Sequence, residues 1–466
     1  MNLIDSRGLA VSTQSAAALA LYERAVAETN GYFGNPLATL DEALAEDPDF
    51  AMAHALRADL AVMSSEQGAL PLVQAGTEAF LRIGSRANAR ERAHLAAAQA
   101  WKDGHFDRAV ALYGDIVIEH PRDLVAIQTA HVIDFYLGDS IMLRDRPAQV
   151  LPHWSAEVPG FGHLLGMHAF GLEEMANYAR AEDAGRRALD LNARDPWAVH
   201  AVQHVFEMQG RVHDGVLWLG ATSPDWAGSA LSFHNWWHLA VHYLELGEIQ
   251  AALDLYDRLI HPNASVVALE LVDASQLLWR ISLRNSDVGT RWKELADCWA
   301  LPAEGGYYAF NDVHALMAYA SAGREDLARR MMAMLEQRAE GTDTNGHNTR
   351  EVGLPLARAI VAMAAGRPAE AAEWLLPIRS RASRIGGSHA QRDLVQLTCI
   401  EAALRCGNGR LARALASERT EQKPASPFNW RLTARALDAC GDAPGAKAAH
   451  EHAELRRRAQ LRQHAA

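Results

Sequence analysis

Apolar residues recur three and four positions apart along nearly the whole chain, the spacing that places side chains on one face of an α-helix. Alanine, leucine, glutamate and arginine dominate these stretches, and all four residue types favour helix. No sustained alternation of apolar and polar residues occurs, and no Asn-Gly turn joins two β-branched runs, so the usual signals of a β-hairpin are missing. The pattern predicts an all-α protein.

A second pattern divides these helices into pairs. A glycine followed by an alanine-rich amphipathic helix recurs at Gly104, Gly210, Gly247, Gly323 and Gly366. We interpret each glycine as the bend inside a helical hairpin. Gly210 and Gly247 lie 37 residues apart, close to the period of about 34 of the tetratricopeptide repeat. The sequence therefore predicts a tetratricopeptide-like solenoid of helical hairpins, because a single hairpin cannot bury its own apolar faces.

The regularity of the repeat varies along the chain and suggests three segments. Residues 1–90 are expected to form irregular N-terminal helical repeats. Residues 91–262 are expected to form central hairpins that carry a histidine-rich groove, and residues 263–466 to form C-terminal repeats with a capping helix. The expected product is one elongated superhelix whose first helices line its concave side.

The repeat register predicts which side chains face that concave side. Counting back from Gly210, the helix expected at 196–209 directs Trp197, His200, His204 and Glu207 inward. The two histidines are four residues apart and the glutamate follows three residues later, so all three lie along one helical stripe. Two imidazoles and a carboxylate on one stripe indicate a candidate functional wall.

The neighbouring hairpins extend this wall. The following hairpin is expected to direct His234 and Trp237 inward and to turn His238 and His242 toward adjacent helices. The preceding hairpin adds His163, although its turn lacks a glycine. The predicted groove thus combines histidines, tryptophans and carboxylates from three successive repeats.

Three interpretations of this wall remain open from the residues alone. His200, His204 and His234 could hold a divalent metal such as zinc, with Glu207 as a base. The same side chains with Trp197 and Trp237 could instead bind a small molecule or a peptide without metal. In the third interpretation the histidines are structural groups bonded to neighbouring carbonyls and carboxylates.

Composition narrows the possible partners and location. The 466 residues carry a formal charge of −12, which argues against nucleic acid, whose binders concentrate lysine and arginine. No apolar run is long enough to cross a bilayer, and the four cysteines contain no C-x-x-C pair, so we expect a cytoplasmic protein without disulfides. Acidic residues near the groove, among them Glu207 and Glu245, predict a preference for cationic ligands.

Several short segments together resemble the tetratricopeptide repeat protein 38 family over most of the chain. They are GLEE at 171–174, WAVH at 197–200, HVFEM at 204–208, HNWWH at 234–238, FNDVH at 310–314, REVGLP at 350–355, LLPIR at 375–379 and GGSHAQRD at 386–393. The first hundred residues match mainly as generic repeat. The resemblance implies the fold more firmly than an activity.

What the resemblance implies about the site can be stated residue by residue. The family motifs fall here on His200, His204, Glu207, His234, Asn235, Trp236, His238, Asp312, His314, Gln391, Arg392 and Asp393. Ionisable residues in such motifs suit an active site, so a soluble enzyme, a metal-dependent hydrolase or lyase, stands as an alternative to a ligand-binding protein. In that case Glu207 or Asp393 is the expected acid or base, and Arg392 holds an anionic group. A protein-protein interaction scaffold is the third functional class.

Overall fold

The computed structural model describes residues 3–302 and 305–462, and this part of the chain is helical apart from one isolated bridge between Ile4 and Ala10. The chain divides into two compact units. The first comprises Met1–Val202, Pro224–Leu231 and Gly341–His347, and the second Gln203–Ser223, Ser232–Glu340 and Asn348–Ala466. The division falls inside the segment 91–262 that the sequence analysis treats as one central block.

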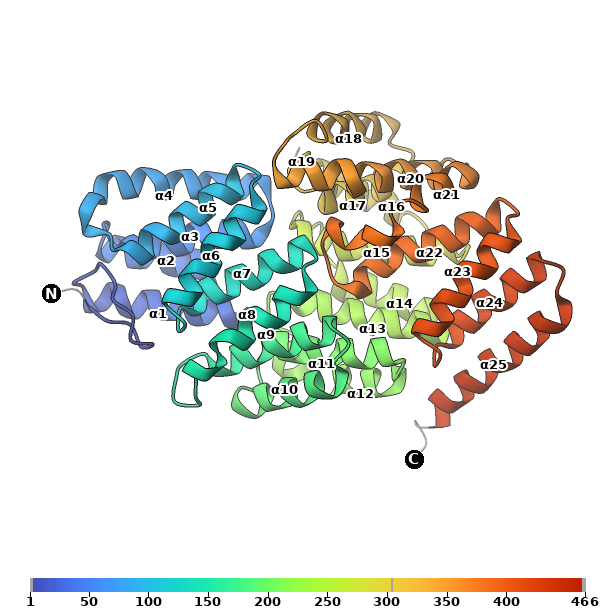
Figure 1. Cartoon of the computed structure of the whole chain (residues 1–466), viewed down its shortest axis with the longest axis horizontal. Coiled ribbons are helices and arrows are strands. Elements are labelled where there is room, and N and C mark those ends of the chain that lie inside the picture. Colours follow the sequence, from blue (N-terminus) through green and yellow to red (C-terminus); the bar gives the residue numbers. More distant parts are fainter. Residues whose placement is uncertain (1–2, 303–304, 463–466) are drawn as a thin grey trace. The chain divides into compact units, whose positions relative to one another are not determined.

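The first unit consists of successive antiparallel hairpins (Figure 1). Its helices are α1 (Ala16–Gly31), α2 (Pro36–Glu46), α3 (Ala51–Ser64), α4 (Leu70–Ile83), α5 (Ala89–Lys102), α6 (Phe106–Glu119), α7 (Leu124–Leu137), α8 (Ser140–Val150), α9 (Phe161–Glu174) and α10 (Tyr178–Leu191). Helices α11 (Pro196–Gln209) and α12 (Val212–Trp226) run across the division between the units, and the short α19 (Thr344–Asn348) lies at another crossing.

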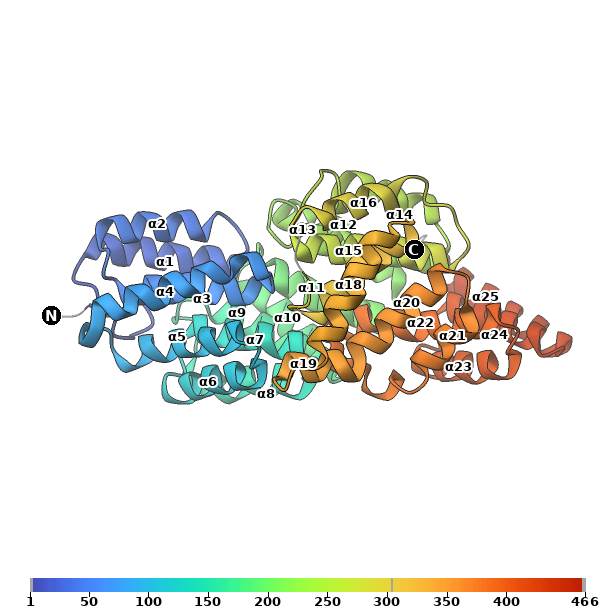
Figure 2. The same ribbon diagram turned by 90° about the horizontal axis from the view of Figure 1, so that it is seen from above.

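The second unit repeats the same hairpin plan (Figure 2). Its helices are α13 (Ser232–Leu246), α14 (Ile249–Leu255), α15 (Ala268–Leu283), α16 (Arg291–Ala300), α17 (Ala309–Ser321), α18 (Glu325–Arg338), α20 (Leu354–Ala364), α21 (Pro368–Leu375), α22 (His389–Arg405), α23 (Gly409–Gln422), α24 (Pro427–Ala439) and α25 (Ala443–Arg462). Two π-helical segments, Tyr256–Ile260 and Thr349–Gly353, and four 3-10 segments, Gln67–Ala69, Gly84–Arg86, Leu151–His153 and Arg379–Ile385, complete the helical structure of the described residues.

The predicted bends are confirmed. The five glycines Gly104, Gly210, Gly247, Gly323 and Gly366 have φ between 69° and 89° and join the two helices of a hairpin. This left-handed conformation ends the first helix of each pair, and glycine adopts it without the steric cost of a Cβ atom. The small residues Ala240 and Ala252 of α13 and α14 are fully buried, as expected where two helices pack closely. The all-α hairpin fold predicted from the sequence is therefore present.

Gly171 shows why one of the family-like segments contains glycine. This residue lies on α9, which packs against α8, and a Cβ atom built there would lie 2.1 Å from the carbonyl oxygen of Leu143. A backbone oxygen cannot move aside as a flexible side chain can. Gly171 is therefore a packing requirement of the first unit.

The first helices of the second unit surround an interior instead of an open groove. Successive contacts link α13 to α15, α15 to α17 and α17 to α20, while α22 packs back on α15 and α24 packs on α13. The last helix also returns, since the Gln460 side chain donates a hydrogen bond to the carbonyl oxygen of Gly210 at 2.6 Å. Side chains expected to line an open concave surface are consequently buried in this unit.

No helix within the described part of the chain is both long enough and apolar enough to cross a membrane.

Candidate functional site

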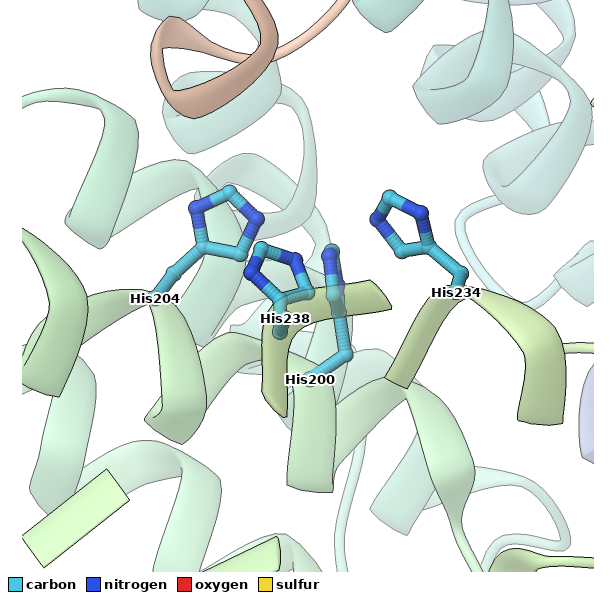
Figure 3. A group of neighbouring side chains, drawn as sticks. All are labelled: His200, His204, His234 and His238. Carbon is cyan, nitrogen blue, oxygen red and sulfur yellow. The ribbon is translucent and has the colours of Figure 1, made fainter. Parts of the chain in front are cut away.

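Three histidines meet inside the second unit. His204 comes from α11, and His234 and His238 come from consecutive turns of α13, with at most 8% of each residue exposed. The ring centroid of His238 lies 4.5 Å from that of His204 and 4.8 Å from that of His234. One nitrogen from each ring lies within 4.8 Å of the others. We call these three residues the histidine cluster; Figure 3 draws them together with His200 from the preceding turn of α11.

Two of these imidazoles are oriented by buried carboxylates. The Nδ1 atom of His234 lies 2.6 Å from Oδ2 of Asp273, which is on α15. The Nδ1 atom of His238 lies 2.8 Å from Oε2 of Glu207, which is on α11. A carboxylate that accepts a hydrogen bond from Nδ1 fixes the tautomer and leaves Nε2 with a lone pair. Both rings are thus prepared to bind a cation through Nε2.

The surroundings of Glu207 and His238 keep this carboxylate charged and this imidazole neutral. Burial alone would raise the pKa of Glu207, but the hydrogen bond from His238 and the nearby positive charges hold it well below its ordinary value. Burial, together with the neighbouring His204, lowers the pKa of His238 well below its ordinary value. Neutral imidazole beside ionised carboxylate is the protonation state that metal binding requires.

A buried histidine of the first unit shows the contrasting, structural arrangement. Both ring nitrogens of His94 face carboxylates, with Nδ1 2.7 Å from Asp59 and Nε2 3.0 Å from Asp123. Arg90 completes the network through a 2.5 Å contact with Asp123. Because neither nitrogen of His94 is left for a further ligand, this network stabilises packing. In the histidine cluster, by contrast, each oriented ring faces a carboxylate through Nδ1 and neighbouring imidazoles as well.

The remaining predicted groove residues of α9 and α11 belong to the first unit. His163 places Nδ1 2.8 Å from Oδ2 of Asp195, so this ring is held at the start of α11. Trp197 meets the ring of Phe170 edge-on, at a centroid distance of 5.0 Å. His200 is 1% exposed and lies 4.8 Å from the Trp197 ring, one helical turn before His204.

Trp237 extends the cluster on α13. This residue is fully buried, and its ring stacks on His234 at 5.5 Å with an interplanar angle of 6°. The guanidinium carbon of Arg280 lies 5.6 Å from the ring centroid of the same tryptophan. The predicted pair of His234 and Trp237 therefore lies side by side, with a cation near the tryptophan.

Other residues implied by the family resemblance have local partners. Asp312 accepts a hydrogen bond from the amide of Gly306 at 3.1 Å, and His314 places Nδ1 2.6 Å from the carbonyl oxygen of Phe310. Gln391 donates to Asp273 over 3.4 Å and thereby supports the carboxylate that orients His234. Arg392 donates to the carbonyl oxygen of Gly387. Of this group, Gln391 thus contacts a carboxylate that orients a histidine of the cluster.

Asp393 is held by two guanidinium groups. Its carboxylate lies 3.1 Å from Arg280 and forms a bidentate pair with Arg419. Burial would raise the pKa of Asp393, yet Arg419 and Arg280 lower it far below the ordinary value. A carboxylate in this state is ionised at any ordinary pH and is suited to anchoring its two arginines.

A cavity lies next to the cluster within the second unit. Its volume is about 30 Å³, and Glu207 is part of its lining. The other charged residues that line it are Glu245, Arg280, Arg284, Asp393, Arg419 and Lys423. Four cationic and three carboxylate side chains therefore face one small space. The sequence suggested an acidic wall that prefers cationic ligands, and it did not reveal these cationic side chains. They lie on or next to α15 and α23, far in sequence from the helix that carries Glu207.

The register predicted that His238 turns toward neighbouring helices. Its ring contacts His204 of the neighbouring helix α11, and it contacts His234 as well, so it joins the two histidines that the register directed inward. Asp273, Arg280 and Arg284 were missed altogether, as was His389, whose ring lies 5.9 Å from His204. These residues lie on α15, directly after it or on α22, which carry no histidine stripe, so only tertiary packing brings them near the cluster.

Comparisons with known proteins give little beyond the architecture. No protein-family model matches the chain. Similar solved structures include a human IFIT1 dimer with PPP-AAAA, at 12% identity over 94% of this chain and 93% of that one, with a TM-score of 0.36. The tetratricopeptide (TPR) domain of P58(IPK) has 12% identity over 81% and 97% of the two chains and a TM-score of 0.22. Naa15/Naa10 bound to HypK-THB has 12% identity over 93% and 67% and a TM-score of 0.23. At such values these likenesses carry no argument about function.

Proposed function

We propose that the second unit binds a divalent transition metal, zinc in the first instance, through Nε2 of His204, His234 and His238, and presents it to a small-molecule ligand. The observation that carries this proposal is the pair of carboxylate–imidazole contacts, His234 to Asp273 and His238 to Glu207. Metal-bound histidines in proteins almost always donate their second ring nitrogen to such a partner.

Three imidazoles are a complete protein set for a catalytic zinc ion, which keeps a fourth position for water or substrate. A metal held by the three histidines would supply an activated water at that position. Hydrolysis or a lyase reaction is the chemistry that such a water would support.

The interior position of the cluster favours a small molecule over a peptide. The cluster residues are at most 8% exposed, and the neighbouring cavity of about 30 Å³ has room for little more than water molecules or one small polar group. A peptide in a groove needs an extended open surface. Membership of the tetratricopeptide repeat protein 38 family and a cytoplasmic location remain predictions.

Within this proposal the two candidate acids or bases have different roles. Glu207 holds His238 and is a positioning residue that also lines the cavity. Asp393 anchors Arg280 and Arg419, and neither of these partners is a histidine of the cluster. Glu207 is therefore a better candidate than Asp393 for a general base at the metal.

The test is the metal content of protein purified without a histidine tag and then exposed to a slight excess of zinc. We expect one equivalent per chain in the wild type and its loss in His204→Ala and in His234→Ala. His450→Ala is the matched control, because His450 is exposed on α25 and outside the cluster. Equal zinc in the wild type and both cluster variants, or none in the wild type, would exclude the metal site and leave a metal-free binding protein or scaffold.

A further inference from the structure

We infer that the cavity beside the histidine cluster is a binding site for an oxyanion, the carboxylate or phosphate group of a small molecule, with Arg284 as its principal ligand. This inference deepens the proposed function by naming a substrate class, and it concerns residues that do not touch the metal-binding nitrogens. Arg284 is on the segment that follows α15, and it lines the cavity together with Arg280, Arg419 and Lys423.

The carboxylates that line the cavity are already engaged. Asp393 is shared by Arg280 and Arg419, and Glu207 orients His238. Glu245 accepts hydrogen bonds from the Ser426 hydroxyl and, at 3.1 Å, from the amide of Phe428 at the start of α24. None of the three is paired with Arg284 in the described part of the structure.

Arg284 therefore carries an uncompensated charge. Its only hydrogen bond among the described residues is a 3.0 Å contact from Nη1 to the carbonyl oxygen of Leu244. The guanidinium carbon lies 3.7 Å above the ring of Phe428, which fixes the plane of the group. Burial lowers the pKa of Arg284 to about 9, and Arg280, Arg431 and Arg419 add to this effect against the charge of Glu245. A bound anion would supply the negative charge that the guanidinium of Arg284 lacks.

Two further cationic donors are directed to the same space. The Nε atom of Arg280 is buried and has no hydrogen-bond partner among the described residues. The ammonium of Lys423, 13% exposed, has one distant partner, Oε1 of Glu207 at 4.0 Å. A planar guanidinium with spare donors, a second guanidinium nitrogen and an ammonium together match the acceptor oxygens of a carboxylate or phosphate.

The position of Glu207 links this site to the proposed metal. One carboxylate oxygen, Oε2, contacts His238 of the cluster, while the other faces Lys423 of the cavity. A small anionic ligand held on Arg284 and Lys423 would consequently lie next to the metal-binding rings. The substrate class is a small organic acid or phosphate monoester.

The experiment measures binding of inorganic phosphate and of succinate by calorimetry at constant ionic strength, with chloride as the reference salt. For the wild type we expect saturable binding of at least one of the two, and the stronger binder identifies the oxyanion. Arg284→Gln should weaken that binding at least tenfold, while Arg284→Lys should retain part of it. Arg379→Gln is the matched control, because Arg379 is a surface residue of the same unit paired with Glu418.

The outcomes separate this inference from the proposed function. Binding should persist after the protein is treated with a chelator, since no metal ligand contributes to the cavity donors. If neither anion binds, or if Arg284→Gln binds as tightly as the wild type, the oxyanion site is excluded even when zinc is present. If Arg284→Gln does not fold, Lys423→Gln replaces it and must also weaken binding. Anion binding by a wild-type protein that takes up no zinc even from a slight excess would support the cavity and exclude the metal site.

Discussion

Replacing Asp273 with alanine is expected to weaken zinc binding about 10- to 100-fold while leaving the second unit folded. Asp273 does not touch the ion in our proposal; it holds Nδ1 of His234 at 2.6 Å and so fixes the direction of Nε2. Without the carboxylate the ring can change its tautomer or rotate. The measurement is competition between the protein and a chelator of known affinity.

Asp257→Ala is the matched control for this experiment. Asp257 is a half-exposed carboxylate of the same unit whose ion-pair partner is Arg291 and not a residue of the cluster. The control should bind zinc as tightly as the wild type. Unchanged affinity in Asp273→Ala would show that His234 needs no orientation by Asp273, and the carboxylate–imidazole argument would then fail.

Replacing Asp123 with alanine should lower the free energy of unfolding by about 3–5 kcal/mol, because it leaves Arg90 and His94 as buried charges without their shared partner. Arg90 and His94 contact Asp123 at 2.5 and 3.0 Å, and all three side chains are at most 3% exposed. Urea denaturation, followed through the unfolding transition of the first unit, measures the change in the free energy of unfolding. Asp115→Ala, an exposed carboxylate on α6, should change stability little.

The same network predicts a dependence of stability on pH. Burial alone would lower the pKa of His94, but the charges of Asp123 and Asp59 raise it to about 9. In the unfolded chain the pKa is about 6.5. The stabilisation is therefore complete below pH 6.5 and is lost as the pH rises through 9. This decline should be smaller in Asp123→Ala; an identical decline in both proteins would assign the pH dependence to other groups.

The fold could be predicted because its determinants are local. The five hairpin glycines and the small residues at helix crossings report directly on backbone conformation and close packing, as the positive φ of Gly247 and the burial of Ala240 show. The closure of the second unit could not be predicted. It depends on α24 meeting α13 and on α25 returning to Gly210, contacts between residues about 190 to 250 positions apart in sequence.

The site was predicted in part for the same reason. His204 and His234 follow from a helical stripe, a property of a single helix. The inward position of His238 depends on how far α13 is rotated against α11, and periodicity alone does not fix that rotation. The orienting residue Asp273 lies 39 positions after His234, so only the packing of α15 on α13 brings them together.

The charge of the cavity shows a further limit of sequence reasoning. An acidic chain with several glutamates near the predicted wall suggested a preference for cations. In the folded unit Glu207 is hydrogen-bonded to His238, and Glu245 accepts a hydrogen bond from the start of α24. Arg284 has no carboxylate partner among the described residues. Net composition counts charges, whereas a binding site depends on which charges are left without a partner.

The most direct test of the central claim is a crystal structure of the zinc-treated protein, with anomalous diffraction recorded on both sides of the zinc absorption edge. The account predicts one strong anomalous peak about 2.0–2.1 Å from Nε2 of His204, His234 and His238, with Nδ1 of the last two still bonded to Asp273 and Glu207. A peak bound by other residues, or an empty cluster in crystals that hold zinc elsewhere, would contradict it.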